Sequence, residues 1–249
     1  MAYKFMKMML PKNKYGIKAP YKRKKPTSIT VHNTDNKAPA KNEISYMIGN
    51  DKKVSFHYAV DDKYVIKGVP DTRGCYHCGS KSGNKNSLAI EICYSTGDLD
   101  KFKAAEKNAA LFIAKKMIQY DLTMKDIYRH KDWNGKNCPK KTMQLGWSRF
   151  KRMVKKEYSI LKKEIGKVRN VGNVPAKVIK KSSTKEQIKW LQEALNVCYS
   201  GKGKDIPVNG KWDAILVTRL NAYRKQLGWK ETTYATEATI KALIFRREA

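Results

Sequence analysis

Short apolar runs and longer stretches with helical periodicity alternate along the first two thirds of the chain. The apolar runs are rich in β-branched and aromatic residues and are bounded by polar ones, which is typical of buried strands. These runs are residues 28–33 (SITVHN), 54–60 (VSFHYAV), 64–69 (YVIKGV) and 87–93 (SLAIEIC). Helical periodicity is found at residues 42–49, 101–120 and 147–163. Strands that alternate with helices around one sheet predict an α/β domain.

Two local signals predict how these elements are connected. The tripeptide at residues 61–63 (DDK) separates two apolar runs, which predicts a hairpin. Residues 126–130 lead into a segment at 132–139 that is marked by Gly, Asn and Pro, and we expect a loop there.

The pattern changes in the last third of the chain. Residues 166–183 contain Gly, Pro and several Lys but no sustained period, so we expect a linker. Three helices are expected beyond it, the first capped by Thr184 and the others at 214–227 and 237–245. The pattern therefore predicts a small all-α domain over residues 184–249.

The charge is strongly unbalanced. The 249 residues include 53 Lys plus Arg and 22 Asp plus Glu, a net charge of +31. Residues 1–25 carry nine basic residues and no acidic one, and we expect a solvated basic arm before a domain at 26–165. The alternative is an electrostatic anchor. Nucleic acid, an anionic membrane and a wall rich in teichoic acid are the polyanions that such a charge favours.

Cysteine usage and the amino terminus bear on the compartment. The five cysteines are an odd number, and a chain of this size does not need disulfides to fold, which favours reduced thiols. Cys75 and Cys78 form a C-x-x-C pair that we expect to be plain thiols or a facultative disulfide. Lys4 and Lys7 interrupt the first apolar run, so it is a poor signal peptide, and no run approaches the roughly 18 apolar residues of a membrane span. We therefore expect synthesis in the cytoplasm.

Two of the four histidines are placed where side chains can meet in a cleft. His32 ends a predicted strand, and His130 begins the segment HKDWNGKNCP, in which Cys138 follows eight residues later. Two imidazoles and one thiolate form a catalytic zinc set that leaves a fourth position open. We therefore predict that His32, His130 and Cys138 bind Zn²⁺.

The motifs VHNT, SFHYAV, NSLAIEIC and HKDWNGKNCP occur in this order between residues 25 and 150. In order and separation they resemble the zinc N-acetylmuramoyl-L-alanine amidases of phage endolysins and bacterial autolysins. The resemblance implies a central mixed β-sheet flanked by helices. It also implies hydrolysis of the bond between N-acetylmuramic acid and L-alanine in peptidoglycan, with anionic wall polymers as a further partner and no specific nucleic acid. A protein of this kind acts on the wall after release from the host cytoplasm.

The resemblance also assigns roles to individual residues. Lys136 matches the lysine that stabilises the oxyanion, and Glu91 matches the acidic residue that acts as general base or proton shuttle. In a strand, Glu91 faces the opposite way from its two isoleucine neighbours and can reach a cleft. His77 and Trp133 are expected to contact substrate, although Trp133 can also simply pack the loop.

The last third of the chain resembles the three-helix peptidoglycan-binding domain. The resemblance is carried by IKWLQEALN, then VNGKW, then TRLNAY, in the order typical of that family. Asp213 stands where that family usually has Gly. The resemblance implies a cell-wall-binding role for residues 184–249.

Two other functions compete with this interpretation. A nucleic-acid-binding protein would explain the charge, but the sequence offers no recognition helix or stacking sheet. A non-catalytic peptidoglycan-recognition protein would share the fold, but such relatives typically lose the cysteine ligand. The presence of Cys138 favours an enzyme.

Overall fold

The chain divides into two units, which are described separately. The computed structural model describes residues 3–169, 178–199, 201 and 203–245. Unit 1 comprises Met1–Tyr158 and unit 2 comprises Ser159–Ala249, so the division falls within the long helix α7 (Trp147–Arg169). Residues 170–177 of the expected linker lie outside the described residues. None of the described helices is both long and apolar enough to cross a membrane.

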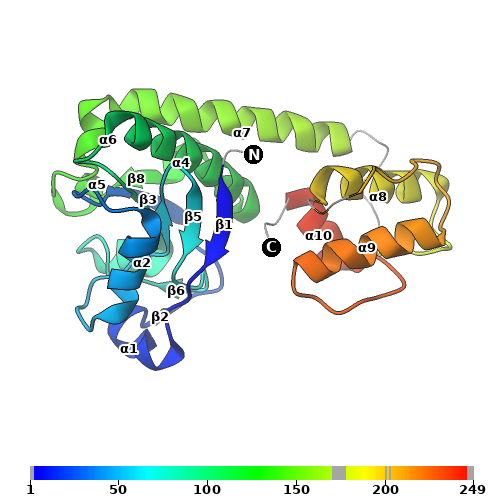
Figure 1. Cartoon of the computed structure of the whole chain (residues 1–249), viewed down its shortest axis with the longest axis horizontal. Coiled ribbons are helices and arrows are strands. Elements are labelled where there is room, and N and C mark those ends of the chain that lie inside the picture. Colours follow the sequence, from blue (N-terminus) through cyan, green and yellow to red (C-terminus); the bar gives the residue numbers. More distant parts are fainter. Residues whose placement is uncertain (1–2, 170–177, 200, 202, 246–249) are drawn as a thin grey trace. The chain divides into compact units, whose positions relative to one another are not determined.

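A six-stranded mixed sheet forms the centre of unit 1 (Figure 1). Its strands are β1 (Lys4–Lys7), β3 (Ser28–Asn33), β4 (Tyr58–Val60), β5 (Tyr64–Lys67), β7 (Ser87–Ile92) and β8 (Ile127–Arg129). They are ordered β1-β5-β4-β7-β3-β8, and all neighbours are parallel except β4 and β5, which form the predicted hairpin. A second, two-stranded sheet pairs β2 (Tyr21–Lys22) with β6 (Arg73–Gly74). The predicted α/β fold with a central mixed sheet is confirmed.

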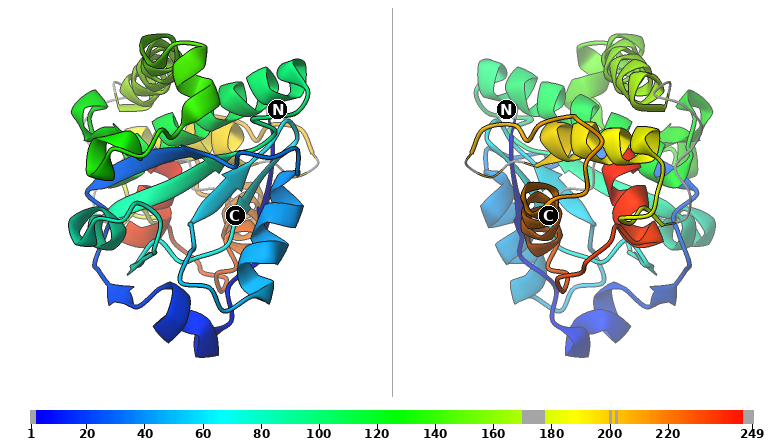
Figure 2. Two further views of the ribbon diagram at one scale, coloured as in Figure 1. Left: turned by 90° about the vertical axis from the view of Figure 1, so that its left-hand side faces the viewer. Right: turned by 90° about the vertical axis from the view of Figure 1, so that its right-hand side faces the viewer.

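Helices cover both faces of the large sheet, as Figure 2 shows from two sides. Phe112 of α4 (Leu99–Tyr120) and Phe150 of α7 share one apolar core with Ile90 of β7. Ile44 of α2 (Ala40–Gly49) belongs to a separate core with Ala89 on the opposite face. The shorter helices are η1 (Lys12–Lys14), α1 (Tyr15–Lys18), α3 (Lys81–Asn86), η2 (Met124–Asp126), α5 (Lys131–Asn134) and α6 (Lys140–Gln144). The loop expected at 132–139 is thus helical in its first part.

The amino-terminal residues differ from the solvated arm that the charge run suggested. Residues 4–7 form β1, an edge strand that pairs in parallel with β5. Phe5 packs against the core under α4, and Leu10 is buried against the opposite face. Lys18 is fully buried, and its ammonium group donates to the backbone oxygens of Lys52 and Val54 at 2.8 and 3.1 Å. The charge run alone does not reveal that this segment is folded. The apolar residues between the lysines make the buried contacts.

Beyond the end of α7, the described residues of unit 2 form the three helices that the sequence predicts, α8 (Lys185–Cys198), α9 (Ala214–Gln226) and α10 (Glu237–Phe245). Thr184 caps α8 in a capping box with Gln187, whose side chain accepts from the Thr184 amide. The core contains Trp190, Leu195 and Leu220, among other apolar side chains. Residues 179 and 235 form an isolated antiparallel bridge, so the end of the expected linker is part of the folded unit.

A buried carboxylate fastens the sheet of unit 1 to α4. Asp71 accepts from the ammonium groups of Lys67 at 2.8 Å and Lys116 at 3.0 Å, and from the hydroxyl groups of Tyr58 and Tyr120. Burial by itself would raise the pKa of Asp71, but these two cations and the hydrogen bonds lower it well below its usual value. The ionised carboxylate therefore stabilises the folded state.

We expect Asp71→Asn to lower the free energy of unfolding by about 3–5 kcal/mol at pH 7, because Lys116 then loses its carboxylate in a buried setting. Because the pKa of Asp71 is lower in the folded state, its ionised carboxylate stabilises the protein above the unfolded-state pKa of about 4. This stabilisation is lost as the pH falls toward the folded-state pKa. Urea unfolding should therefore show that the free energy of unfolding of the variant differs from that of the parent by a constant amount between pH 5 and 7. Below about pH 4 this difference should become smaller. A difference that stays constant down to pH 2 would contradict this explanation.

Candidate metal centre

Three parallel strands bring the predicted site residues to one edge of the sheet. β3 lies between β7 and β8 and is parallel to both, so the carboxyl ends of all three strands meet. His32 on β3 is directly opposite Glu91 on β7. Val31 and Ile90 belong to the core under α4, so their neighbours His32 and Glu91 face the other side, as the alternation predicts. His130 follows the last residue of β8.

Three donor atoms converge at this edge. Nδ1 of His32 lies 3.1 Å from Nδ1 of His130 and 3.8 Å from Sγ of Cys138. The three atoms all lie within 4.8 Å of one another, and all three residues are buried. Tetrahedral zinc with ordinary bond lengths would separate two nitrogen ligands by about 3.4 Å and a nitrogen and a sulfur ligand by about 3.6 Å. The donor set and its spacing therefore fit a zinc ion.

The protonation of the two imidazoles also suits metal binding. Burial lowers the pKa of His32 well below its usual value and lowers that of His130 to about 4, with the nearby charge of Lys136 acting in the same direction. Both rings are therefore neutral at pH 7, as a metal ligand must be. Burial and the carboxylate of Glu91 raise the pKa of Cys138 to about 12. A bound cation would offset this by stabilising the thiolate.

Backbone contacts hold the ligand loop against the sheet. The amide of His130 donates to the carbonyl of Val31 at 3.3 Å, which continues the pairing of β8 with β3. The amide of Lys131 donates to the carbonyl of Cys138 at 2.9 Å and closes the loop between the two ligands. The loop contains the short helix α5. This helix ends at Gly135, which adopts a positive φ of 82°. The sequence predicted this return of the thiol but not the helix.

Glu91 lies half-buried beside the cluster. Its Oε1 lies 4.0 Å from Nδ1 of His32, and its Oε2 has no hydrogen-bond partner among the described residues. Burial raises the pKa of Glu91 to about 8; the carboxylate of Glu43 adds to this, and Lys136 opposes it. A carboxyl group whose pKa lies near neutrality is suited to take and return a proton.

The comparisons with known proteins identify the family of the chain. The sequence profile of the N-acetylmuramoyl-L-alanine amidase family matches residues 22–141. The N-acetylmuramoyl-L-alanine amidase CwlA of Bacillus subtilis (strain 168) is 41% identical over 199 residues, which cover 78% of this chain and 71% of that protein. The chain belongs to the N-acetylmuramoyl-L-alanine amidase family. The alignment with CwlA covers more residues of this chain than unit 1 contains. It therefore extends into unit 2.

Solved structures give the same result for the fold of this amidase. The structure of PlyL is 42% identical, with a TM-score of 0.59, and the match covers 61% of this chain and 96% of that chain. A mutant endolysin from Bacillus subtilis is 32% identical, with a TM-score of 0.56, over 61% of this chain and 99% of that chain. The number of residues of this amidase that each of these structures matches is close to the number of residues in unit 1.

Lys136 occupies an exposed position in the ligand loop of the amidase, two residues before Cys138. Its charge acts on His32, His130 and Glu91, whose pKa values it lowers. The structure thus brings Lys136 close enough to the predicted site to influence its charges.

The other sequence-predicted residues lie around the cluster. Nδ1 of His77 is 3.0 Å from Nε2 of His32, on the edge of that ring away from His130. The indole of Trp133 donates to Oγ1 of Thr30 at 2.9 Å and lies against the ring of Tyr128, which favours the packing role over the substrate contact.

His57 and the C-x-x-C pair are structural. His57 is fully buried; its Nδ1 accepts from the amide of Ala89 at 2.9 Å, and its Nε2 lies 2.7 Å from the carbonyl oxygen of Arg73. Cys75 and Cys78 are both buried free thiols, the first of the two alternatives that the sequence left open.

Sequence reasoning missed a clamp behind the cysteine loop of the amidase. The side-chain oxygen of Asn33 accepts from the amide of Thr142 at 3.0 Å, and its amide group donates to the Thr142 hydroxyl at 3.2 Å. This pair fastens α6, which follows Cys138, to the end of β3, which carries His32. Its members lie 109 residues apart and have no motif of their own, so no local signal could have found them.

A small cavity opens at the same edge of the sheet. Its volume is about 220 Å³, and it is lined by Asp35, Ser95, Thr96, Lys140, Lys141 and Gln144. These residues follow β3, β7 and Cys138 along the chain. The cavity therefore adjoins the segments that carry the metal cluster.

Proposed function

We propose that this amidase is a zinc enzyme, that His32 Nδ1, His130 Nδ1 and Cys138 Sγ hold the ion, and that the protein serves as a phage endolysin. The convergence of these three donor atoms carries the proposal, because two neutral imidazoles and a cysteine match a catalytic zinc set. The similarity to an endolysin from Bacillus subtilis supports the biological role.

Zinc, when bound, acidifies a water molecule to a pKa of about 7 and polarises the scissile carbonyl group. The chain supplies the remaining groups. Glu91, half-buried beside His32, takes the proton of the attacking water and returns it to the departing amine of L-alanine. Lys136 donates to the oxygen of the tetrahedral intermediate, whose negative charge its ammonium group stabilises.

The helical unit 2 and the positive charge complete the proposal. We assign residues 184–249 to retention of the enzyme on the wall, supported by the order of their motifs and by the alignment with CwlA that extends beyond unit 1. The net charge of +31 favours anionic wall polymers as an additional partner.

Cys138→Ser should remove bound zinc and reduce hydrolysis to background, because a serine hydroxyl does not ionise near neutral pH and is a poor ligand. Zinc content is measured by elemental mass spectrometry. Mass spectrometry of digested peptidoglycan counts new amino termini on L-alanine. Cys198→Ser is the control, since Cys198 belongs to unit 2 and is not a member of the cluster. Full activity of Cys138→Ser, or of the parent after chelation, would refute the proposal.

Glu91→Gln keeps the size of the side chain but removes its ability to take a proton. We expect zinc content to stay near that of the parent and kcat to fall by about 10²- to 10⁴-fold, the usual contribution of a general base. Single-turnover hydrolysis of a purified muropeptide is the measurement. A rate within a few-fold of the parent would exclude Glu91 as the base.

A further inference from the structure

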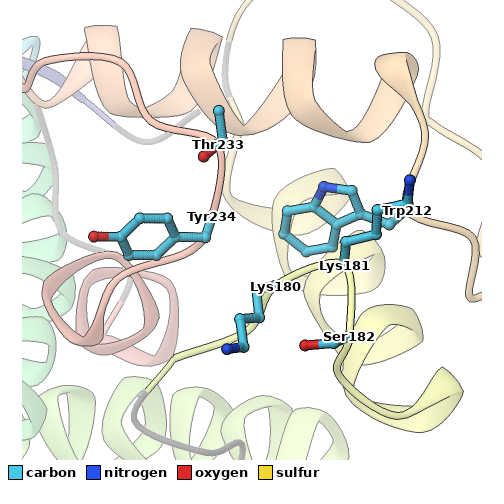
Figure 3. Close-up of a pocket in the computed structure, with 6 residues that line it drawn as sticks. All are labelled: Lys180, Lys181, Ser182, Trp212, Thr233 and Tyr234. Atoms are coloured by element: carbon cyan, nitrogen blue, oxygen red, sulfur yellow. The ribbon is translucent and has the colours of Figure 1, made fainter.

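Unit 2 contains a pocket that the proposed activity does not use. Its volume is about 650 Å³, within the range of small-molecule sites, and it is lined by Lys180, Lys181, Ser182, Trp212, Thr233 and Tyr234. Figure 3 shows the indole of Trp212 beside the segment that carries Lys180 and Lys181, and the ring of Tyr234 extending away from that indole. The lining includes two lysines, three hydroxyl groups and no acidic side chain.

Two of the three segments that form the pocket are fastened to each other, and the third is fastened to α8. The backbones of Ile179 and Ala235 exchange hydrogen bonds of 3.1 and 2.8 Å, which pins the lysine segment to the Tyr234 segment. Gln192, almost fully buried in α8, accepts from the amide of Gly210 at 2.8 Å and donates to the carbonyl of Lys211 at 3.1 Å. These bonds fix the turn that presents Trp212. The pocket is therefore preformed, which lowers the entropic cost of binding.

We propose that this pocket binds an anionic saccharide of the bacterial wall, with the sugar ring against the indole of Trp212 and its carboxylate or phosphate attracted by the lysines of the lining. Aromatic rings offer an apolar face to a sugar ring, and the hydroxyl groups of Ser182 and Thr233 can exchange hydrogen bonds with its substituents. Two cations without a nearby carboxylate in the lining favour an anionic ligand. The inference rests on the proposed wall-binding role of unit 2 and specifies its site.

The test uses the full chain with Cys138→Ser, so that the wall is not digested, and measures binding to purified walls by sedimentation. Tyr234→Ala removes an exposed ring, and Lys180→Ala/Lys181→Ala removes two charges. We expect each to weaken binding by about tenfold or more, as aromatic anchors and paired charges at a binding site commonly do. The matched control Lys225→Ala/Lys230→Ala removes the same charge from exposed positions outside the pocket and should change binding by less than about twofold.

Walls stripped of phosphodiester polymers distinguish the two sources of the anion. Binding that survives stripping and still depends on Tyr234 assigns the pocket to the carboxylates of peptidoglycan, and binding lost on stripping assigns it to phosphate. Equal losses in the pocket and control variants, or no loss in either, would overturn the proposal. Wall digestion by the Cys138→Ser chain would instead contradict the proposed zinc site, so the two failures are distinguishable.

A separate observation concerns His77. Its Nε2 lies 3.3 Å from the carbonyl oxygen of Gly83 and 3.2 Å from the hydroxyl of Ser87, which itself donates to that carbonyl at 2.9 Å. A carbonyl oxygen only accepts, so Nε2 of His77 carries the proton and its Nδ1 is the acceptor. Nε2 of His32, 3.0 Å away, therefore donates to His77.

This chain of hydrogen bonds leaves Nδ1 of His32 without a proton, with its lone pair available at the cluster formed with His130 and Cys138. We infer that His77 is a positioning residue that fixes the tautomer and the ring orientation of His32 for metal binding. Partners of this kind commonly change metal affinity by about 10- to 100-fold. The inference rests on the proposed zinc site.

Chelator competition measures the zinc dissociation constant of each variant. His77→Ala should bind zinc about 10- to 100-fold more weakly, and His77→Gln, whose amide can both accept and donate, should recover most of the affinity. His57→Ala is the matched control, because it removes another buried histidine of unit 1 that lies outside the cluster. Unchanged affinity in His77→Ala, or an equal loss in His57→Ala, would overturn the inference; a parent that binds no zinc would contradict the proposed function instead.

Discussion

The parallel pairing of β3 with β7 and β8 is the constraint on which the active site depends. It puts His32 opposite Glu91 and lets the chain leave β8 directly into His130. Because side chains alternate along a strand, the same pairing buries Val31 and Ile90 in the core under α4 and turns the polar residues to the other side. A slip of one residue in this register would exchange the two sets and destroy both the core and the site.

The low polarity around this edge then determines the chemistry. Burial keeps His32 and His130 neutral and raises the pKa of Glu91 to about 8, so one environment prepares both metal ligands and a proton acceptor. Lys136, at an exposed position in the same loop, adds positive charge that lowers the pKa values of His32, His130 and Glu91. The donor set is compatible with the amidase family to which the chain belongs.

Much of this could be predicted from the sequence because its signals are local. The strand at residues 28–33 and the helix Glu237–Phe245 have the bounds that the pattern predicts, and the ligand motif has fixed spacing. The role of residues 4–7 as an edge strand, the Asn33–Thr142 clamp and the contact of His77 with His32 depend on which distant segments meet. Pairing between distant segments leaves no periodicity in a single sequence, so these features emerged only from the structure.

X-ray absorption at the zinc edge of the purified protein tests the central claim most directly, because it reports the atoms bound to the ion. The account predicts two nitrogen ligands at about 2.0–2.1 Å and one sulfur ligand at about 2.3 Å, with a lighter atom in the fourth position. A zinc environment without sulfur, or a protein that retains no zinc when purified without chelators, would contradict the assignment of His32, His130 and Cys138.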